Sequence, residues 1–251
     1  MDSALRSIAR APLSGFLPRW LSAWMLATAL SSFLLAFGNA LDPRGRDRLA
    51  VYVAFAGFLS FPAFAGLLQG VMMRGLLRRS TLWGALTGGG IATAAMTVVL
   101  MTLIISDLWW PLPVRLALWV AHTFGLAVYP VYFVRLTSAS VPFGLILGAI
   151  QAIVFAPRWG SVAAWIVIST AAAVLTGLWF YAWISVEPVA SLYSRMAGFM
   201  PLTGEWRYLP ATVLWAEGAA LCFALPTGLL MQRLLRRHQR ADAAALVRRF
   251  E

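Results

Sequence analysis

The chain has 251 residues, of which 61% are hydrophobic and 12% are charged. Soluble globular domains carry about 45–50% apolar and about 25% charged residues, so this composition is typical of a membrane protein and excludes a disordered, collagen-like or disulfide-rich chain. All 20 basic residues are arginine, and with 9 acids the net charge is +11. The arginines lie beside apolar stretches, which indicates membrane topology and argues against a nucleic-acid partner.

Six stretches are apolar over the roughly 20 residues that a helix needs to cross a bilayer. They are 20–41, 49–73, 82–106, 137–157, 161–185 and 209–232. A seventh stretch, 116–134, is interrupted by His122 and Pro130. Stretch 20–41 could also be a signal peptide, but it is longer than the usual apolar core of about 7–15 residues.

The distribution of arginine favours six spans over seven. With six spans and the N-terminus inside, 13 arginines lie inside and 7 outside, as the positive-inside rule requires. A seventh span would move the six C-terminal arginines outside. We therefore predict an all-α membrane protein of a bacterial inner membrane, with six spans and cytoplasmic termini. Residues 116–134 would form an outer interfacial helix, although a spanning segment stays open for them.

A short pattern recurs along the chain and predicts three tandem hairpins. Gln69, Gln151 and Gln232 lie near the ends of the second, fourth and sixth stretches, each shortly after a glycine. The odd stretches carry a Trp-x-x-x-Thr/Ser motif, at Trp24 and Thr28, Trp83 and Thr87, and Trp165 and Ser169. The predicted repeats are 20–77, 82–158 and 161–237, followed by a basic inner tail at 238–251. Such parallel repeats are related by an axis along the membrane normal.

This pattern resembles a loose group of bacterial multi-pass membrane proteins, common in cyanobacteria, with a Gly-x-x-Gln…Leu-Arg…Trp signature in Gly-rich hairpins. Gln69, Leu77-Arg78 and Trp83 fit it best, and the similarity covers most of residues 20–237. The second repeat departs from it, because no Leu-Arg pair follows Gln151. The resemblance implies a hairpin membrane fold and brings no activity with it.

Four polar residues within the spans are candidates for a functional site. Gln69, Gln151 and Gln232 are expected at similar depth, where their amides would form a polar ring for binding or permeation. The alternative is interhelical hydrogen bonding, worth about 0.6 kcal/mol per contact in membranes. Glu217 is the one acid within a span, where a charge costs about 2.5–3.5 kcal/mol. It is either a functional acid or a structural residue that is protonated or reaches the headgroups.

An outer surface is the second candidate region. Arg115, Trp119 and His122 share a face of stretch 116–134, and Trp109 and Trp110 precede it. This surface could bind a partner or ligand, or could belong to the aromatic belt that membrane proteins place at the interface. His122 could also ligate the metal of a haem or chlorophyll-type pigment. The sequence requires no cofactor; bound lipid is expected.

No sequence motif for catalysis or metal binding is present, so we expect no enzyme, no catalytic residue and no metal. The predicted function is a non-catalytic accessory, scaffold or assembly subunit of a larger inner-membrane complex. A respiratory or photosynthetic energy-transducing complex is one host of this kind. The alternatives are a small transporter or channel that uses the three glutamines and Glu217, and a membrane enzyme that depends on Glu217.

Overall fold

The computed structural model describes residues 15–41, 48–74, 77, 79–104, 119, 123, 130–155, 159–185, 191, 195 and 209–247. These residues are helical except at a few turn and connecting positions next to α1, α2 and α3, and no β-strand occurs among them. The long helices are α1 (Phe16–Leu41), α2 (Arg48–Met72), α3 (Ser80–Ile104), α6 (Pro130–Ala152), α7 (Trp159–Ser185) and α9 (Leu209–Val247). A short 3₁₀ helix, η2 (Ile153–Phe155), follows α6. The predicted all-α fold is confirmed.

Within the described ranges, four segments are long and apolar enough to cross a membrane: Phe16–Gly38, Ser80–Leu100, Gly160–Ala182 and Pro210–Arg237. They coincide with four of the six stretches expected from the sequence, and they identify the chain as a membrane protein surrounded by lipid. The other two stretches correspond to α2 and α6, whose apolar segments are shorter, at Leu59–Met72 and Ala139–Ala152.

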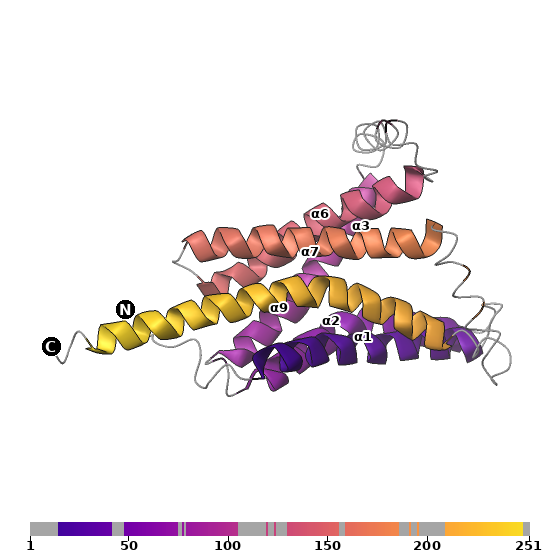
Figure 1. Ribbon diagram of the computed structural model, residues 1–251. Coiled ribbons are helices and arrows are strands. Elements are labelled where there is room, and N and C mark those ends of the chain that lie inside the picture. The colour runs from indigo at the N-terminus through magenta and orange to yellow at the C-terminus, as the bar shows by residue number, and fades with distance from the viewer. Residues whose placement is uncertain are drawn as a thin grey trace.

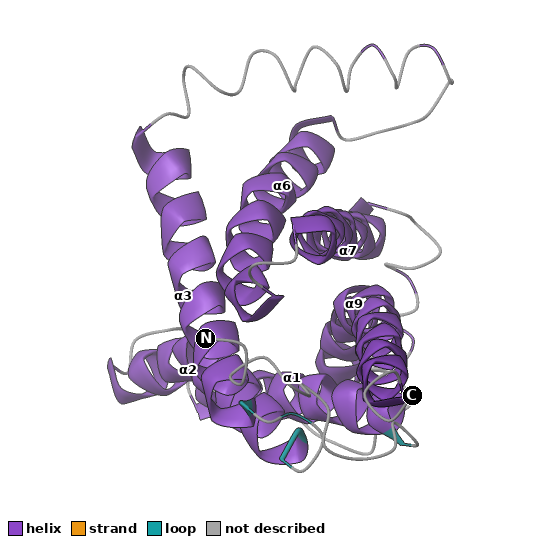
Figure 2. Cartoon of the chain, turned by 90° about the vertical axis from the view of Figure 1, so that its left-hand side faces the viewer, coloured by secondary structure: helices purple, strands orange, loops and turns teal. Residues whose placement is uncertain are grey.

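The six helices form a closed ring. α1 packs on α2, α2 on α3, α3 on α6, α6 on α7, α7 on α9, and α9 returns to α1 (Figures 1 and 2). The first and last helices are therefore neighbours although they are far apart in the sequence. The ring closes at the α9/α1 junction. The junctions α2/α3 and α6/α7, by contrast, each join helices that follow one another closely along the chain.

Glycine allows the backbones at the α2/α3 junction to touch. A Cβ atom on Gly66 would lie 2.7 Å from the carbonyl oxygen of Gly84, and one on Gly88 would lie 2.8 Å from that of Pro62. The α6/α7 junction is similar, because a Cβ on Gly148 would lie 3.0 Å from the Cβ of Ser169. Small residues at such crossings let membrane helices approach closely, and this brings polar side chains on neighbouring helices into reach of one another.

Candidate functional site: a buried tryptophan–glutamine cluster

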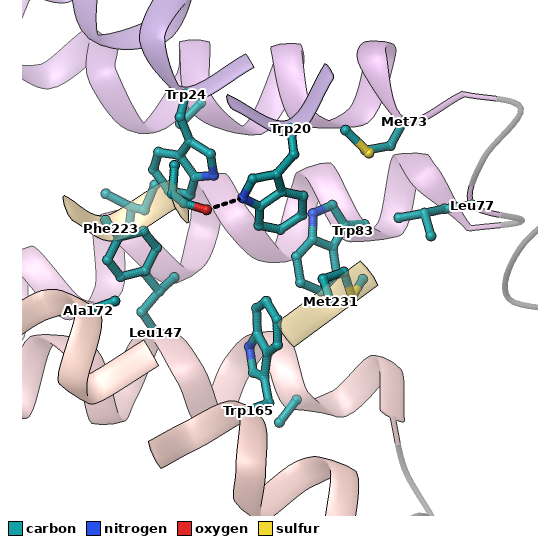
Figure 3. Packing of buried hydrophobic residues seen from close by; sticks show 14 of the residues in the cluster. Trp20, Trp24, Met73, Leu77, Trp83, Leu147, Trp165, Ala172, Phe223 and Met231 are labelled. Carbon is teal, nitrogen blue, oxygen red and sulfur yellow. Dashed lines mark hydrogen bonds between the residues drawn. The ribbon is translucent and has the colours of Figure 1, made fainter. Parts of the chain in front are cut away.

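Three tryptophans from alternate helices of the ring meet in its interior. Trp20 of α1, Trp83 of α3 and Trp165 of α7 are fully buried. Their ring centroids are 5.7 Å apart for Trp20 and Trp83, 5.5 Å for Trp83 and Trp165, and 6.3 Å for Trp20 and Trp165 (Figure 3). The two contacts of Trp165 are edge-to-face, the geometry that aromatic pairs prefer. We call these three residues the tryptophan cluster.

Gln69, which lies on α2, links this helix to both α1 and α3 beside the tryptophan cluster. The indole Nε1 of Trp83 donates a hydrogen bond to Gln69 Oε1 (3.3 Å), and Gln69 Nε2 donates to the carbonyl oxygen of Trp20 (3.5 Å). Gln69 is fully buried on α2. Its amide therefore bridges α2 to α3 on one side and to α1 on the other.

Gln151 makes a matching bridge 82 residues further along the chain. The indole Nε1 of Trp165 donates to Gln151 Oε1 (3.3 Å), and Gln151 Nε2 donates to Thr87 Oγ1 (3.0 Å). Gln151 is fully buried too, and Trp and Gln are 14 residues apart in both bridges. In each case the carbonyl of the amide accepts from the tryptophan of the next helix in the ring, and its NH₂ group donates to the helix before it in the ring.

The third junction, between α9 and α1, has no such bridge. Met231 lies three residues after Gly228, as Gln69 follows Gly66, and Met231 is fully buried. Gln232 comes one residue later, which turns its side chain by about 100° around the helix axis. It is half-buried, and within the described part of the chain it has no hydrogen bond. The expected ring of three amides is thus replaced by two bridges and a methionine.

Trp20 closes the third junction differently. Its Nε1 donates to the carbonyl oxygen of Ala224 on α9 (2.9 Å). The indole also packs closely on Gly228: a Cβ atom at that position would lie only 2.6 Å from Trp20 Cδ1. The sequence pattern suggested Trp24 as the counterpart of Trp83, but Trp20 has that place in the cluster. Trp24 lies one turn further along α1 and packs on Phe223 of α9 (Figure 3). Trp20 and Trp24 are four residues, or about one helical turn, apart, and this spacing was the sequence signal that either of them could take this place.

Ser169 is a buried hydroxyl that lacks the amide donor its counterpart Thr87 has. It lies four residues after Trp165, as Thr87 lies four residues after Trp83, and it is fully buried. Thr87 accepts a hydrogen bond from Gln151, whereas Ser169 Oγ finds no partner among the described residues. By the same geometry the side chain that would reach Ser169 is residue 231, and methionine has no N–H to donate.

This geometry predicts the effect of Met231→Gln. The new amide is expected to donate to Ser169 Oγ and to stabilise the bundle by about 0.6 kcal/mol, the mean for interhelical hydrogen bonds in membranes. Reversible unfolding in bicelles measures the change. Adding Ser169→Ala should remove the gain, and Met231→Leu, which keeps the volume without the amide, should show none. A loss of stability in Met231→Gln that is the same with and without Ser169→Ala would show that residue 231 does not reach Ser169.

Glu217 lies apart from the cluster. It precedes Met231 by 14 residues on α9, or about 21 Å along the helix. The residue is half-buried, and both carboxyl oxygens are enclosed without a hydrogen-bond partner in the described ranges. Near it, Trp179 of α7 donates through Nε1 to the carbonyl oxygen of Trp215 (2.8 Å) and ties α7 to α9. The structure therefore does not bring the acid and the amides into one site.

The outer candidate surface is described only at Trp119, which is 62% exposed. Arg115, His122, Trp109 and Trp110 lie outside the described residues. No group of three or more His, Cys, Asp or Glu side chains that could hold a metal occurs within the described ranges.

Comparisons with known proteins return no match: no family model, no curated protein and no solved structure is similar to this chain. The function proposed below therefore comes from the residues and contacts of the chain itself.

Proposed function

We propose that the chain crosses the inner membrane six times, with both ends in the cytoplasm. α2 and α6 have 25 and 23 residues, and at 1.5 Å per residue each reaches across the roughly 30 Å of hydrocarbon. In the ring, α2 lies between α1 and α3, and α6 lies between α3 and α7, so each is flanked by two helices that are long and apolar enough to span. Arg19, Arg74 and Arg79 are exposed at the start of α1 and between α2 and α3, and Arg233 is exposed near the end of the apolar part of α9. The positive-inside rule assigns this end of the bundle to the cytoplasm.

Within this topology we propose a non-catalytic scaffold or accessory subunit of a larger membrane complex. The observation that carries the proposal is the hydrogen bonding of two buried amides. Gln69 and Gln151 each accept a hydrogen bond from one neighbouring helix and donate one to another. Groups held in this way fix helix positions, and because both side chains are fully buried, neither amide is open to a solute in this structure. The interior between α1, α3 and α7 is occupied by the tryptophan cluster at the same level.

The partners of such a subunit would contact its membrane-facing and outer surfaces. Large apolar side chains such as Tyr52, Leu67 and Val167 are more than 60% exposed; lipid covers such residues, and so does a neighbouring subunit. For partner or ligand contact we propose the outer surface expected from the sequence at Arg115, Trp119 and His122, of which the structure describes Trp119, since aromatic residues and arginine are enriched in interfaces. A respiratory or photosynthetic complex is a host of this type.

Reconstitution into liposomes tests this function against transport. A structural subunit is expected to give the same solute and proton flux as empty liposomes. Gln69→Leu and Gln151→Leu should then change stability and leave flux at that background. A flux above background that disappears in both variants, while Gln232→Leu retains it, would overturn the proposal and assign the amides to a permeation path.

A small transporter is the second candidate, and one observation favours it: the carboxyl oxygens of Glu217 are enclosed without a partner among the described residues. An acid inside a membrane is a common element of ion and proton pathways. As a structural residue, Glu217 should tolerate Glu217→Gln with unchanged flux and unchanged co-purifying subunits. Abolished flux in Glu217→Gln, compared with a folded wild-type control in the same liposomes, would decide for transport.

A further inference from the structure

α9 carries four arginines on one face where it leaves the apolar part of the bundle. Arg233, Arg236, Arg237 and Arg240 are all exposed and follow the spacing i, i+3, i+4, i+7. At 100° per residue these positions fall within an arc of about 100°, and they cover about 10 Å of helix length. We call them the arginine stripe.

The opposite side of the same helix segment is packed against the protein. Leu234 and Leu235 lie between the arginines in sequence and are 4% and 0% exposed. α9 is a continuous helix from Leu209 to Val247, so the stripe is held on a rigid element and its direction is fixed by the buried leucines. The stripe therefore faces away from the bundle.

The charges of the stripe are not balanced within the helix. Four pairs of its members are three or four residues apart, a spacing at which like charges repel and destabilise a helix. No acidic residue lies between Glu217 and Asp242 in the sequence. A set of external anions that pairs with the guanidinium groups would remove this repulsion, and guanidinium groups bind phosphate oxygens in a bidentate manner.

The depth of the stripe in the bilayer indicates which anions lie near it. The apolar span of α9 ends at Arg237, so Arg233, Arg236 and Arg237 lie where the hydrocarbon gives way to the headgroups. The headgroup region extends about 5–7 Å beyond the hydrocarbon on each side. Lipid phosphates are present at this depth around the whole protein, whereas an acidic protein would have to reach into the bilayer surface. We propose that the arginine stripe is a binding site for the phosphate groups of anionic phospholipids.

The test uses the full-length protein in nanodiscs of mixed phosphatidylcholine and phosphatidylglycerol. After gentle transfer into mild detergent, mass spectrometry gives the ratio of anionic to zwitterionic phospholipid that each protein retains. Replacing all four stripe arginines by glutamine should lower this ratio, by about fivefold for each arginine whose lipid contact is fully lost. The all-lysine version keeps the charges and should retain an intermediate ratio, because lysine binds phosphate as a point charge.

Two controls keep the result interpretable. Glutamine at Arg19, Arg74 and Arg79, which are exposed at the same end of the bundle, should change the ratio less than the stripe variant does. Unfolding in bicelles should show that the stripe variant still folds, since the buried face at Leu234 and Leu235 is untouched; if it does not fold, single replacement of Arg236 gives the comparison.

Any of three results would overturn the assignment. One is an unchanged lipid ratio in the folded stripe variant. The second is a wild-type protein that retains no excess of anionic lipid and, in native membranes, loses an acidic protein on mutation of the stripe; that result would make the stripe a protein-docking surface. The third is displacement of the lipid by inorganic phosphate at moderate concentration, which would show a general anion site and contradict specific binding of phospholipid.

Discussion

Replacing Gln151 by leucine is expected to destabilise the bundle by about 1–3 kcal/mol. The change removes the acceptor of Trp165 Nε1 and the donor to Thr87 Oγ1 together, and a buried polar group left unpaired costs about 1–3 kcal/mol. Leucine is close to glutamine in size, so the loss would come from the hydrogen bonds. Reversible unfolding in bicelles, followed by tryptophan fluorescence, measures it.

Gln232→Leu is the matched control for this variant. The same substitution is made near the corresponding end of the apolar part of α9. There, Gln232 is half-buried and has no hydrogen bond to a described residue. Its removal should change stability by less than about 0.5 kcal/mol, as is usual away from such features. Equal losses in both variants would mean that the Gln151 bridge contributes nothing beyond the general cost of the substitution.

Gly84→Ala is expected to separate α2 from α3. The added Cβ would fall on the carbonyl oxygen of Gly66 and lie 2.9 Å from the Cα of Gly70, and neither backbone can move aside without shifting its helix. Overpacking of a well-packed contact typically costs about 1–3 kcal/mol. The shift should also weaken the hydrogen bond between Gln69 and Trp83, which spans this junction, and so move the tryptophan emission of the folded protein.

Gly89→Ala provides the opposite outcome in the same helix. No atom lies within 4 Å of a Cβ at Gly89, which is exposed. Alanine is a better helix former than glycine by about 0.8–1.0 kcal/mol in water, so the exposed substitution should be neutral or stabilising. If Gly84→Ala were as well tolerated as Gly89→Ala, close backbone contact would not be what holds this junction.

The sequence predicted the helices well, because the length of an apolar stretch sets a span directly. The 14-residue spacing from Gln69 to Trp83 recurs from Gln151 to Trp165, but the pattern alone did not indicate that these tryptophans donate to the glutamines. The failure at Gln232 has a simple cause: one residue of offset hardly changes its depth but rotates a side chain by about 100°. A pattern matched by depth alone cannot detect this rotation.

The closure of the ring could not be read from local patterns. The hydrogen bond from Trp20 Nε1 to the carbonyl of Ala224 joins residues 204 positions apart. Neither position carries a motif of its own, and Trp24 fitted the repeat pattern better than Trp20 did. Only the packing of α9 against α1 decides which tryptophan enters the cluster, and it also leaves Ser169 without the donor that its counterpart Thr87 has.

Purification from native membranes tests most directly the proposal that this protein is a structural subunit of a larger complex. The protein should be isolated at its natural abundance in mild detergent, and the same fraction analysed by mass spectrometry and visible absorption. The proposed function predicts other membrane subunits in fixed stoichiometry, with or without a pigment band that identifies the host. A particle that contains only the 27.4 kDa chain and lipid, without partner or chromophore, would contradict it.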